Sequence, residues 1–167
     1  MDGAKEMSEQ SVYLEYVLAK DKYDHAQMLY DQVLTERERL FEMTQPKALN
    51  YDKDRVDGGE IKNTMEEYLI LKEKSNIDGR LTEAFLLIED RKVMLDIKGQ
   101  DLRRSKNLYD RIYLKYHIEK ERVIRIARYL HYSESQIYRI LVNINTQIQH
   151  ARKCEKNNGM IHSEHVE

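Results

Sequence analysis

The sequence predicts an all-α protein in which a long antiparallel, coiled-coil-like helical hairpin precedes a three-helix helix-turn-helix module. Three observations lead to this prediction. The 167 residues include one proline and six glycines, so few of them break helices. A heptad repeat of apolar side chains runs along the N-terminal part of the chain. Near the C-terminus, a tight break with a helix-capping residue separates two apolar helical patterns.

The first helix is expected from about Ser8 to Met43, a stretch without helix breakers. Its apolar seam has alternating spacings of four and three, which favours a second helix packed along its length. The seam consists of Val12, Tyr16, Ala19, Tyr23, Ala26, Tyr30, Val33 and Leu40, with Arg37 in the remaining position. The apolar residues expected to be exposed beside it are Tyr13, Leu14, Val17, Leu18, Met28, Leu29, Leu34 and Phe41. Because one partner helix cannot cover so wide a surface, we expect a further helix from a second subunit.

Residues 44–60 interrupt the helical pattern. Pro46 disfavours helix at the residue before it, and the run Asp57-Gly58-Gly59 is typical of a turn. Loops of this length are uncommon in compact domains unless they are functional or disordered.

A second helix is expected from about Ile61 to Ile97. Its apolar stripe slips in phase in the middle, which predicts a stutter or kink near Asp78 and Gly79. Gly99 is the expected end of this helix, because glycine commonly follows the last helical residue. Joined by one loop, the first two helices most simply fold back on each other.

Three shorter helices are expected at about Asp101–Tyr116, Glu119–Leu130 and Ser133–Arg152. The tail from Cys154 to Glu167 has scattered charges and an Asn-Asn-Gly run, and it is predicted to be disordered. The predicted domains are therefore the hairpin over residues 8–98 and the helix-turn-helix module over residues 101–153, followed by the tail at 154–167.

The charge is unevenly distributed along the chain. Residues 1–100 carry 15 basic and 22 acidic side chains, whereas residues 101–153 carry 12 basic and 5 acidic side chains. This asymmetry indicates that only the C-terminal part meets a polyanion. The alternative is chance clustering, since helical proteins often have charged faces.

The stretch from Glu121 to Leu141 has the spacing of a helix-turn-helix. The first of its two helices has one apolar face, made by Val123, Ile126, Ala127 and Leu130. The second has a new apolar phase, made by Ile137, Ile140, Leu141, Ile144 and Ile148. Ser133 and Gln136 form a capping-box pattern at its start. His131 occupies the turn position where many such motifs have a glycine in the left-handed conformation, which histidine tolerates better than most residues. A plain helical hairpin in a bundle core is the alternative.

The solvent face of the second helix carries short polar residues and one arginine, which can enter a major groove. Arg139 can pair with the O6 and N7 atoms of guanine. The first helix exposes arginines suited to phosphates. The predicted DNA-contacting residues are Arg122, Arg125, Arg128, Ser133, Glu134, Ser135, Gln136, Tyr138 and Arg139.

The run from Leu108 to Ile148 resembles the sigma-factor region-4-like module of small phage-encoded late-gene transcriptional activators of the RinA/ArpU type. The resemblance is carried by Tyr116, Ile126, Ala127, Leu130, Ser133, Ile137, Tyr138 and Arg139. It implies a phage- or prophage-encoded regulator that binds double-stranded DNA sequence-specifically. The hairpin is then expected to mediate homo-oligomerisation, most simply as a dimer, or contact with the host RNA polymerase.

Two other functions stay open, namely a DNA-packaging recognition subunit similar to a small terminase, and a protein-interaction or inhibitor protein whose helix-turn-helix is only a scaffold. An enzyme is not expected, because no glycine-rich phosphate loop or nucleophile motif is present. No cofactor or metal is expected either, since Cys154 and the C-terminal histidines match no zinc-ligand spacing. A single cysteine and no membrane-spanning apolar run favour the cytoplasm of a bacterial host.

Overall fold

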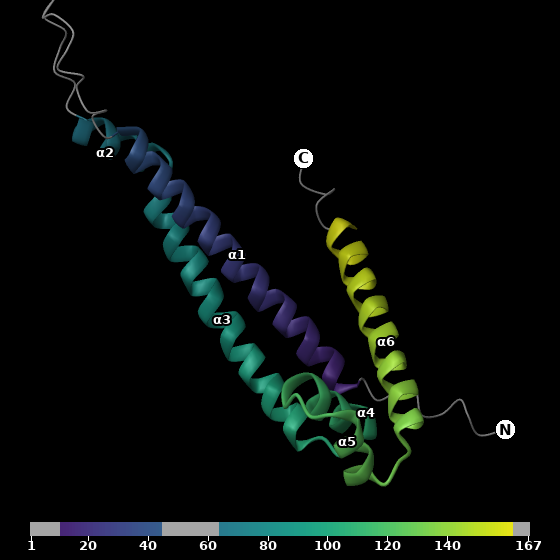
Figure 1. Ribbon diagram of the computed structural model, residues 1–167. Helices are drawn as coiled ribbons and strands as arrows, with labels where there is room; N and C mark the ends of the chain where they lie inside the picture. Colours follow the sequence, from purple (N-terminus) through teal and green to yellow (C-terminus); the bar gives the residue numbers. More distant parts are fainter. Residues whose placement is uncertain (1–10, 45–63, 162–167) are drawn as a thin grey trace, which may run out of the picture. The chain divides into compact units, whose positions relative to one another are not determined.

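The computed structural model describes residues 11–44 and 64–161, and every regular element in these ranges is a helix, which confirms the all-α prediction. In chain order the elements are α1 (Val12–Thr44), α2 (Thr64–Lys74), α3 (Ile77–Arg104), α4 (Leu108–Tyr113), the π-helical turn η1 (Leu114–Ile118), α5 (Val123–Leu130) and α6 (Glu134–Ile161) (Figure 1). None of the described helices is long and apolar enough to cross a membrane. The predicted interruption at 44–60, apart from Thr44, lies outside the described residues, as do residues 8–10 and 162–167.

The second predicted helix is in fact two helices. The break falls at Ser75 and Asn76, slightly before the predicted kink. Asn76 adopts a φ of 48°, and its N–H donates to the Glu73 carbonyl at 3.1 Å. Asparagine tolerates this left-handed conformation better than most residues, so it ends α2 and lets α3 start in a new direction.

Gly99 does not end a helix, because α3 continues through it to Arg104. A Cβ atom at Gly99 would lie 3.5 Å from the ring of Tyr16, so α1 packs closely against α3 at this position. The expected helix from Asp101 to Tyr116 is divided instead. Asn107 caps α4, since its Oδ1 accepts a hydrogen bond from the Tyr109 N–H at 2.8 Å.

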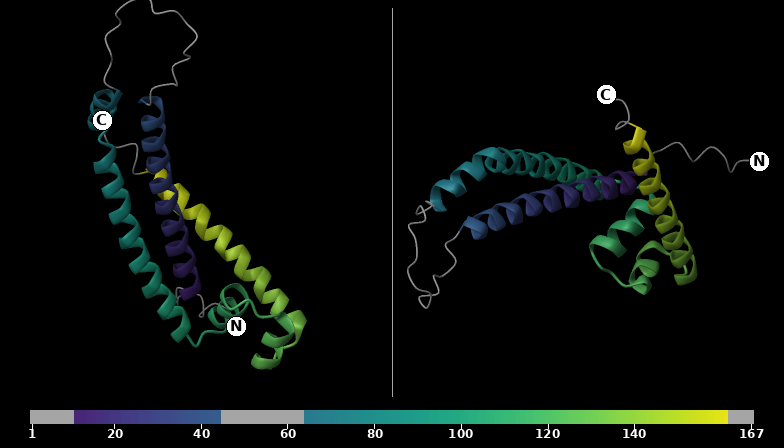
Figure 2. Two further views of the ribbon diagram at one scale, coloured as in Figure 1. Left: turned by 60° about the vertical axis from the view of Figure 1, so that its left-hand side comes forward. Right: turned by 90° about the horizontal axis from the view of Figure 1, so that it is seen from above.

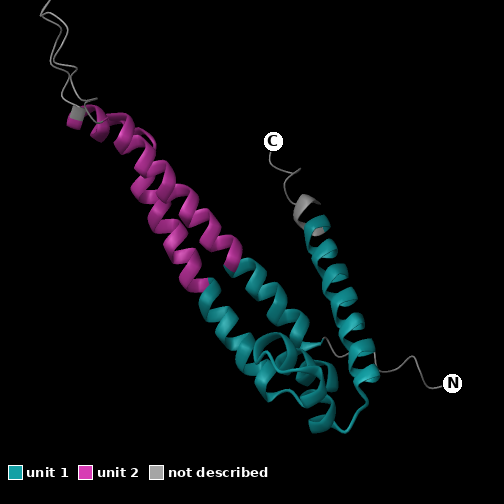
Figure 3. Ribbon diagram, viewed as in Figure 1, with its two compact units in different colours: residues 1–23, 91–167 teal, residues 24–90 magenta. Residues whose placement is uncertain are grey.

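The chain separates into two compact units, to both of which α1 and α3 contribute (Figure 3). Unit 1 comprises residues 1–23 and 91–167, and unit 2 comprises residues 24–90. These boundaries differ from the predicted division into 8–98 and 101–153. The physical reason is that the start of α1 and the end of α3 share a core with the helix-turn-helix helices.

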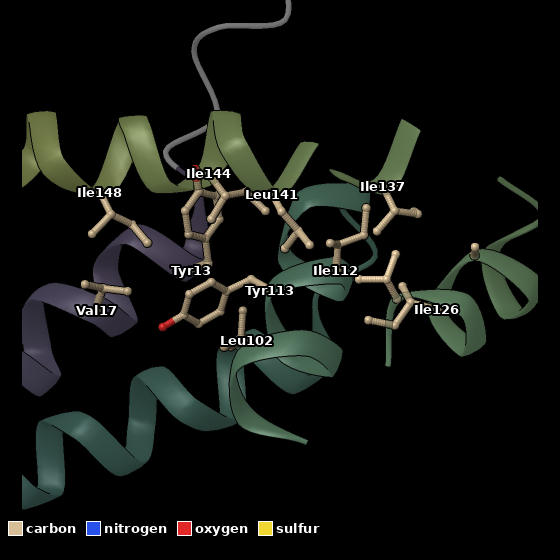
Figure 4. Close-up of a cluster of buried hydrophobic side chains, with 12 residues drawn as sticks. Tyr13, Val17, Leu102, Ile112, Tyr113, Ile126, Ile137, Leu141, Ile144 and Ile148 are labelled. Carbon is tan, nitrogen blue, oxygen red and sulfur yellow. The ribbon is translucent and has the colours of Figure 1, made fainter. Parts of the chain in front are cut away.

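That shared core is one apolar cluster in unit 1 (Figure 4). Tyr13 is fully buried in it and Val17 is 5% exposed, so the expectation that these two side chains lie on the surface is wrong. Instead they belong to a cluster that also contains residues from α3, α4, α5 and α6. The other buried members are Leu102, Ile112, Tyr113, Val123, Ile126, Ala127, Ile137, Leu141, Ile144 and Ile148.

A buried carboxylate fixes the start of α1 within this core. Asp110 of α4 is 1% exposed, and it accepts hydrogen bonds from the Tyr13 N–H at 2.9 Å and from the Ser105 hydroxyl at 2.5 Å. The Tyr13 hydroxyl donates to Oε1 of Gln147 on α6. Burial, together with the charge of Asp110, raises the pKa of Tyr13 to about 12, so this hydroxyl keeps its proton at neutral pH.

Helix α6 is longer than predicted and continues to Ile161, so the start of the predicted disordered tail is helical. Its second half is held to the unit 1 part of α1 by two ion pairs, and Figure 2 shows both helices in two further views. Arg152 binds Asp21 through two hydrogen bonds of 2.7 and 2.8 Å, and Lys22 lies 2.9 Å from Glu155. These tertiary contacts support turns of α6 for which the local sequence gives little helical signal.

In unit 2, residues 24–44 of α1 lie beside α2 and the first part of α3. Phe41 meets Tyr68 edge to face at 5.4 Å between ring centroids, and Glu36 pairs with Arg80 at 2.8 Å. Because Phe41 meets a residue that precedes Arg80, the chain directions are opposite, as expected for a hairpin.

The buried apolar residues in the described part of unit 2 are Ala26, Val33 and Ile77. The first two are seam positions of α1, as predicted, whereas Tyr30 and Leu40 are only partly buried and Arg37 is exposed.

Of the residues expected to be exposed beside the seam along the whole of α1, Met28 and Phe41 are exposed, whereas four are half-buried. These four are Leu14, Leu18, Leu29 and Leu34.

Candidate nucleic-acid interface

The turn between α5 and α6 is built by a left-handed residue. His131 has φ 59° and ψ 39°, the conformation expected for it from the sequence. The N–H of Tyr132 donates to the Ala127 carbonyl at 3.0 Å, and the N–H of His131 donates to the Arg128 carbonyl at 3.4 Å. This pair of bonds is a Schellman motif, which satisfies the last carbonyls of α5 and reverses the chain.

Helix α6 starts with the predicted capping box. The Gln136 N–H donates to the Ser133 hydroxyl at 3.3 Å, and the Ser133 N–H donates back to Oε1 of Gln136 at 2.9 Å. The Ser133 N–H, which has no partner within the helix, is therefore satisfied, and the Gln136 N–H is shared between the hydroxyl and the carbonyl of Ser133. The Schellman motif that ends α5 is followed directly by the capping box that begins α6, so the two caps together fix the angle between these helices.

Two opposite lines of side chains run along α6. The buried line has the spacing i, i+4, i+7, i+11 and consists of Ile137, Leu141, Ile144 and Ile148. A second line with the same spacing starts two residues earlier and consists of Ser135, Arg139, Val142 and Thr146, all exposed. Because two residues turn a helix by about 200°, the second line lies opposite the core. We call it the outward line.

All nine residues predicted to contact DNA are exposed. The structure brings three of them together, since Arg128, Ser133 and Glu134 line one shallow depression at the turn. Arg122 and Arg125 do not line it. Arg122 is the N-cap residue of α5, and Arg125 and Tyr129 follow it three and seven residues later, on a stripe of the helix.

This arginine stripe ends at a cluster that sequence reasoning missed. The Tyr129 ring is 58% exposed, with Nζ of Lys115 4.3 Å and the Arg111 guanidinium 5.5 Å from its centroid. Arg111 comes from α4 and Lys115 from η1, so the cluster joins these two elements to α5. The only sequence signal was the high basic content of residues 101–153, because a cation over a ring is a tertiary contact.

Lys115 is held by two carboxylates. Its Nζ lies 3.3 Å from Glu121 and 3.5 Å from Glu119. Burial by itself lowers the pKa of Lys115, but the hydrogen bonds and charges of the two glutamates outweigh it and leave the pKa raised. The side chain therefore stays protonated and positioned beside Tyr129.

A half-buried histidine lies in the π-helical turn, two residues after Lys115. The His117 ring stacks on Tyr113 at 4.8 Å and meets Tyr116 edge to face at 5.0 Å. Its Nε2 atom has no hydrogen-bond partner among the described residues. Burial, and secondarily the charge of Lys120, lowers the pKa of His117, so its ring is neutral at physiological pH.

The candidate interface offers hydrogen-bonding side chains on the start of α6 and cations on α5. Within residues 11–44 and 64–161, no group of three or more His, Cys, Asp or Glu side chains could hold a metal ion. Comparisons with models of protein families, with curated proteins and with solved structures found no match to this chain.

Proposed function

We propose that this protein is a sequence-specific transcriptional regulator that binds double-stranded DNA, inserting the start of α6 into the major groove. The observation that carries the proposal is the outward line of α6, which presents Ser135 and Arg139 directly opposite the buried line. An α-helix fits the major groove, and an arginine there pairs with guanine in two hydrogen bonds.

The basic face of α5 supplies the sequence-independent part of the binding. Arg122, Arg125 and Arg128 are exposed at the start and along the length of the helix that precedes the turn, where helix-turn-helix proteins cross the DNA backbone. Arg111 adds a further cation beside Tyr129, whereas Lys115 is already paired with Glu119 and Glu121. Neutralising phosphates releases counterions, so binding should weaken steeply as the salt concentration rises.

The proposed regulator acts as a homodimer held by the hairpin. Many large apolar side chains of unit 2 are exposed, including Leu69 at 54%, Phe85 at 51% and Leu86 at 61%. Apolar surface of this kind marks protein contacts, and a dimer can occupy two half-sites one helical turn of DNA apart. The resemblance to phage late-gene activators adds the host RNA polymerase as a second proposed partner of the hairpin.

The proposal is tested by measuring the affinity of purified protein for selected and random DNA across a salt series. We expect Arg139→Ala to lose about 1–3 kcal/mol on the selected site and little on random DNA. Arg37→Ala is the matched control, because it removes an exposed arginine from unit 2 and should leave both affinities unchanged. The absence of salt-dependent DNA binding would contradict the proposal and favour a purely protein-interacting role.

A further inference from the structure

The outward line of α6 changes its chemistry along its length. Ser135 and Arg139 offer hydrogen bonds at its start, whereas Val142 follows them with an aliphatic side chain. Val142 is 66% exposed, which makes it the most exposed large apolar side chain in the described part of unit 1. It lies three residues after Arg139, on the side of the helix opposite the core.

The next residue on this line, Thr146, forms a hydrogen bond within the helix. The Thr146 hydroxyl donates to the Val142 carbonyl at 3.0 Å, so its hydrogen-bonding group is used within the helix. The second half of the outward line therefore offers aliphatic groups rather than free donors. On the major-groove edge of a base pair in unmodified DNA, the apolar feature is the C5 methyl group of thymine.

We propose that Val142 reads the C5 methyl group of a thymine beside the guanine read by Arg139. Three helical residues separate the two side chains by about 4.5 Å along the helix axis, close to the roughly 3.4 Å step between base pairs. Each half-site then contains a guanine and a neighbouring thymine. This inference rests on the proposed DNA-binding function and specifies which chemical groups the protein recognises.

The experiment starts by selecting preferred sites from random duplex DNA with the full-length protein. Each thymine of one half-site is then replaced by deoxyuridine, which lacks only the methyl group. We expect the replacement at one position, adjacent to the essential guanine, to reduce the affinity about fourfold. This loss corresponds to the free energy of transferring one aliphatic carbon from an apolar contact to water. At that position 5-methylcytosine should bind better than cytosine.

The variant Val142→Ala connects this loss to the side chain. It should bind the thymine site more weakly than the wild type and should not distinguish thymine from deoxyuridine at that position. The matched control is Val93→Ala, which shortens a valine of unit 1 that is 57% exposed on α3, and it should keep the wild-type discrimination. Alanine is a good helix former and Val142 is exposed, so the variant should fold normally.

The outcomes separate this inference from the function on which it rests. A selected site that contains no thymine beside the guanine would overturn the inference but not the DNA-binding function. Unchanged discrimination by Val142→Ala would also overturn it, because another group would then contact the methyl. If selection enriches no sequence at all, both the proposed function and this inference fail.

Discussion

Ile137 in unit 1 and Leu86 in unit 2 are both aliphatic helix residues, yet the first is fully buried and the second is 61% exposed. The contrast extends to the units as a whole. Unit 1 gathers apolar residues from α1, α3, α4, α5 and α6 into one cluster. In the described part of unit 2 only three apolar residues are buried, and large apolar side chains on α1, α2 and α3 are exposed.

The difference has a geometric cause. Several short helices surround a volume, so their apolar faces converge on common neighbours. A narrow helical hairpin instead buries one stripe per helix and leaves the residues beside it in water. Unit 1 therefore has its own core, whereas the described part of unit 2 leaves large apolar side chains exposed. This contrast supports placing the proposed DNA contact in unit 1 and the proposed dimer contact in unit 2.

The largest expected effect tests where the stability resides. Ile137→Ala should lower the free energy of unfolding by about 2–5 kcal/mol, because it creates a cavity in the unit 1 cluster. Leu86→Ala should change it by no more than about 0.5 kcal/mol. Urea denaturation followed by circular dichroism at low protein concentration measures both. Equal losses in the two variants would contradict the contrast between the units.

The next prediction concerns the exposed apolar side chains of unit 2. We expect the full chain to sediment as a dimer, and replacing Leu69, Phe85 and Leu86 together by glutamine should shift it towards the monomer. The helical circular dichroism should persist, since all three side chains are already exposed. As a control, Val93→Gln changes an exposed side chain of unit 1. A dimer that survives the triple substitution would place self-association on a different surface.

The smallest expected effect is a pH dependence that originates in unit 1. The pKa of folded His117 lies below 6.5, so the unfolded chain takes up a proton first as the pH falls. Stability should therefore decrease from about pH 6.5 downwards until the folded pKa is passed. His117→Gln should flatten this part of the curve in urea titrations at several pH values. The control, His25→Gln, removes an exposed imidazole from unit 2, and equal flattening by both variants would refute the assignment to His117.

Features made by neighbours in the chain could be predicted from the sequence. The capping box of Ser133 and Gln136 and the left-handed His131 depend on hydrogen bonds that span three to five residues. The buried line of α6 follows from its apolar period, because a helix places residues of that spacing on one side. The exposure of the nine candidate DNA-contacting residues agrees with the spacing of apolar residues in α5 and α6, which leaves these positions outside the buried faces.

Tertiary structure alone decided the features that depend on distant partners. Tyr13 and Val17 stand beside the heptad seam, yet they are buried because α4 and α6 contribute a second surface to the start of α1. The cations over Tyr129 and the turns of α6 after Arg152 likewise depend on residues from other elements. The spacing of apolar residues along a helix predicts which side chains are buried, but it does not predict which other helix packs against them. The spacing of apolar residues in the sequence therefore determined where the helices form and which side of α6 is buried. The packing of α1 against distant helices determined where the units divide.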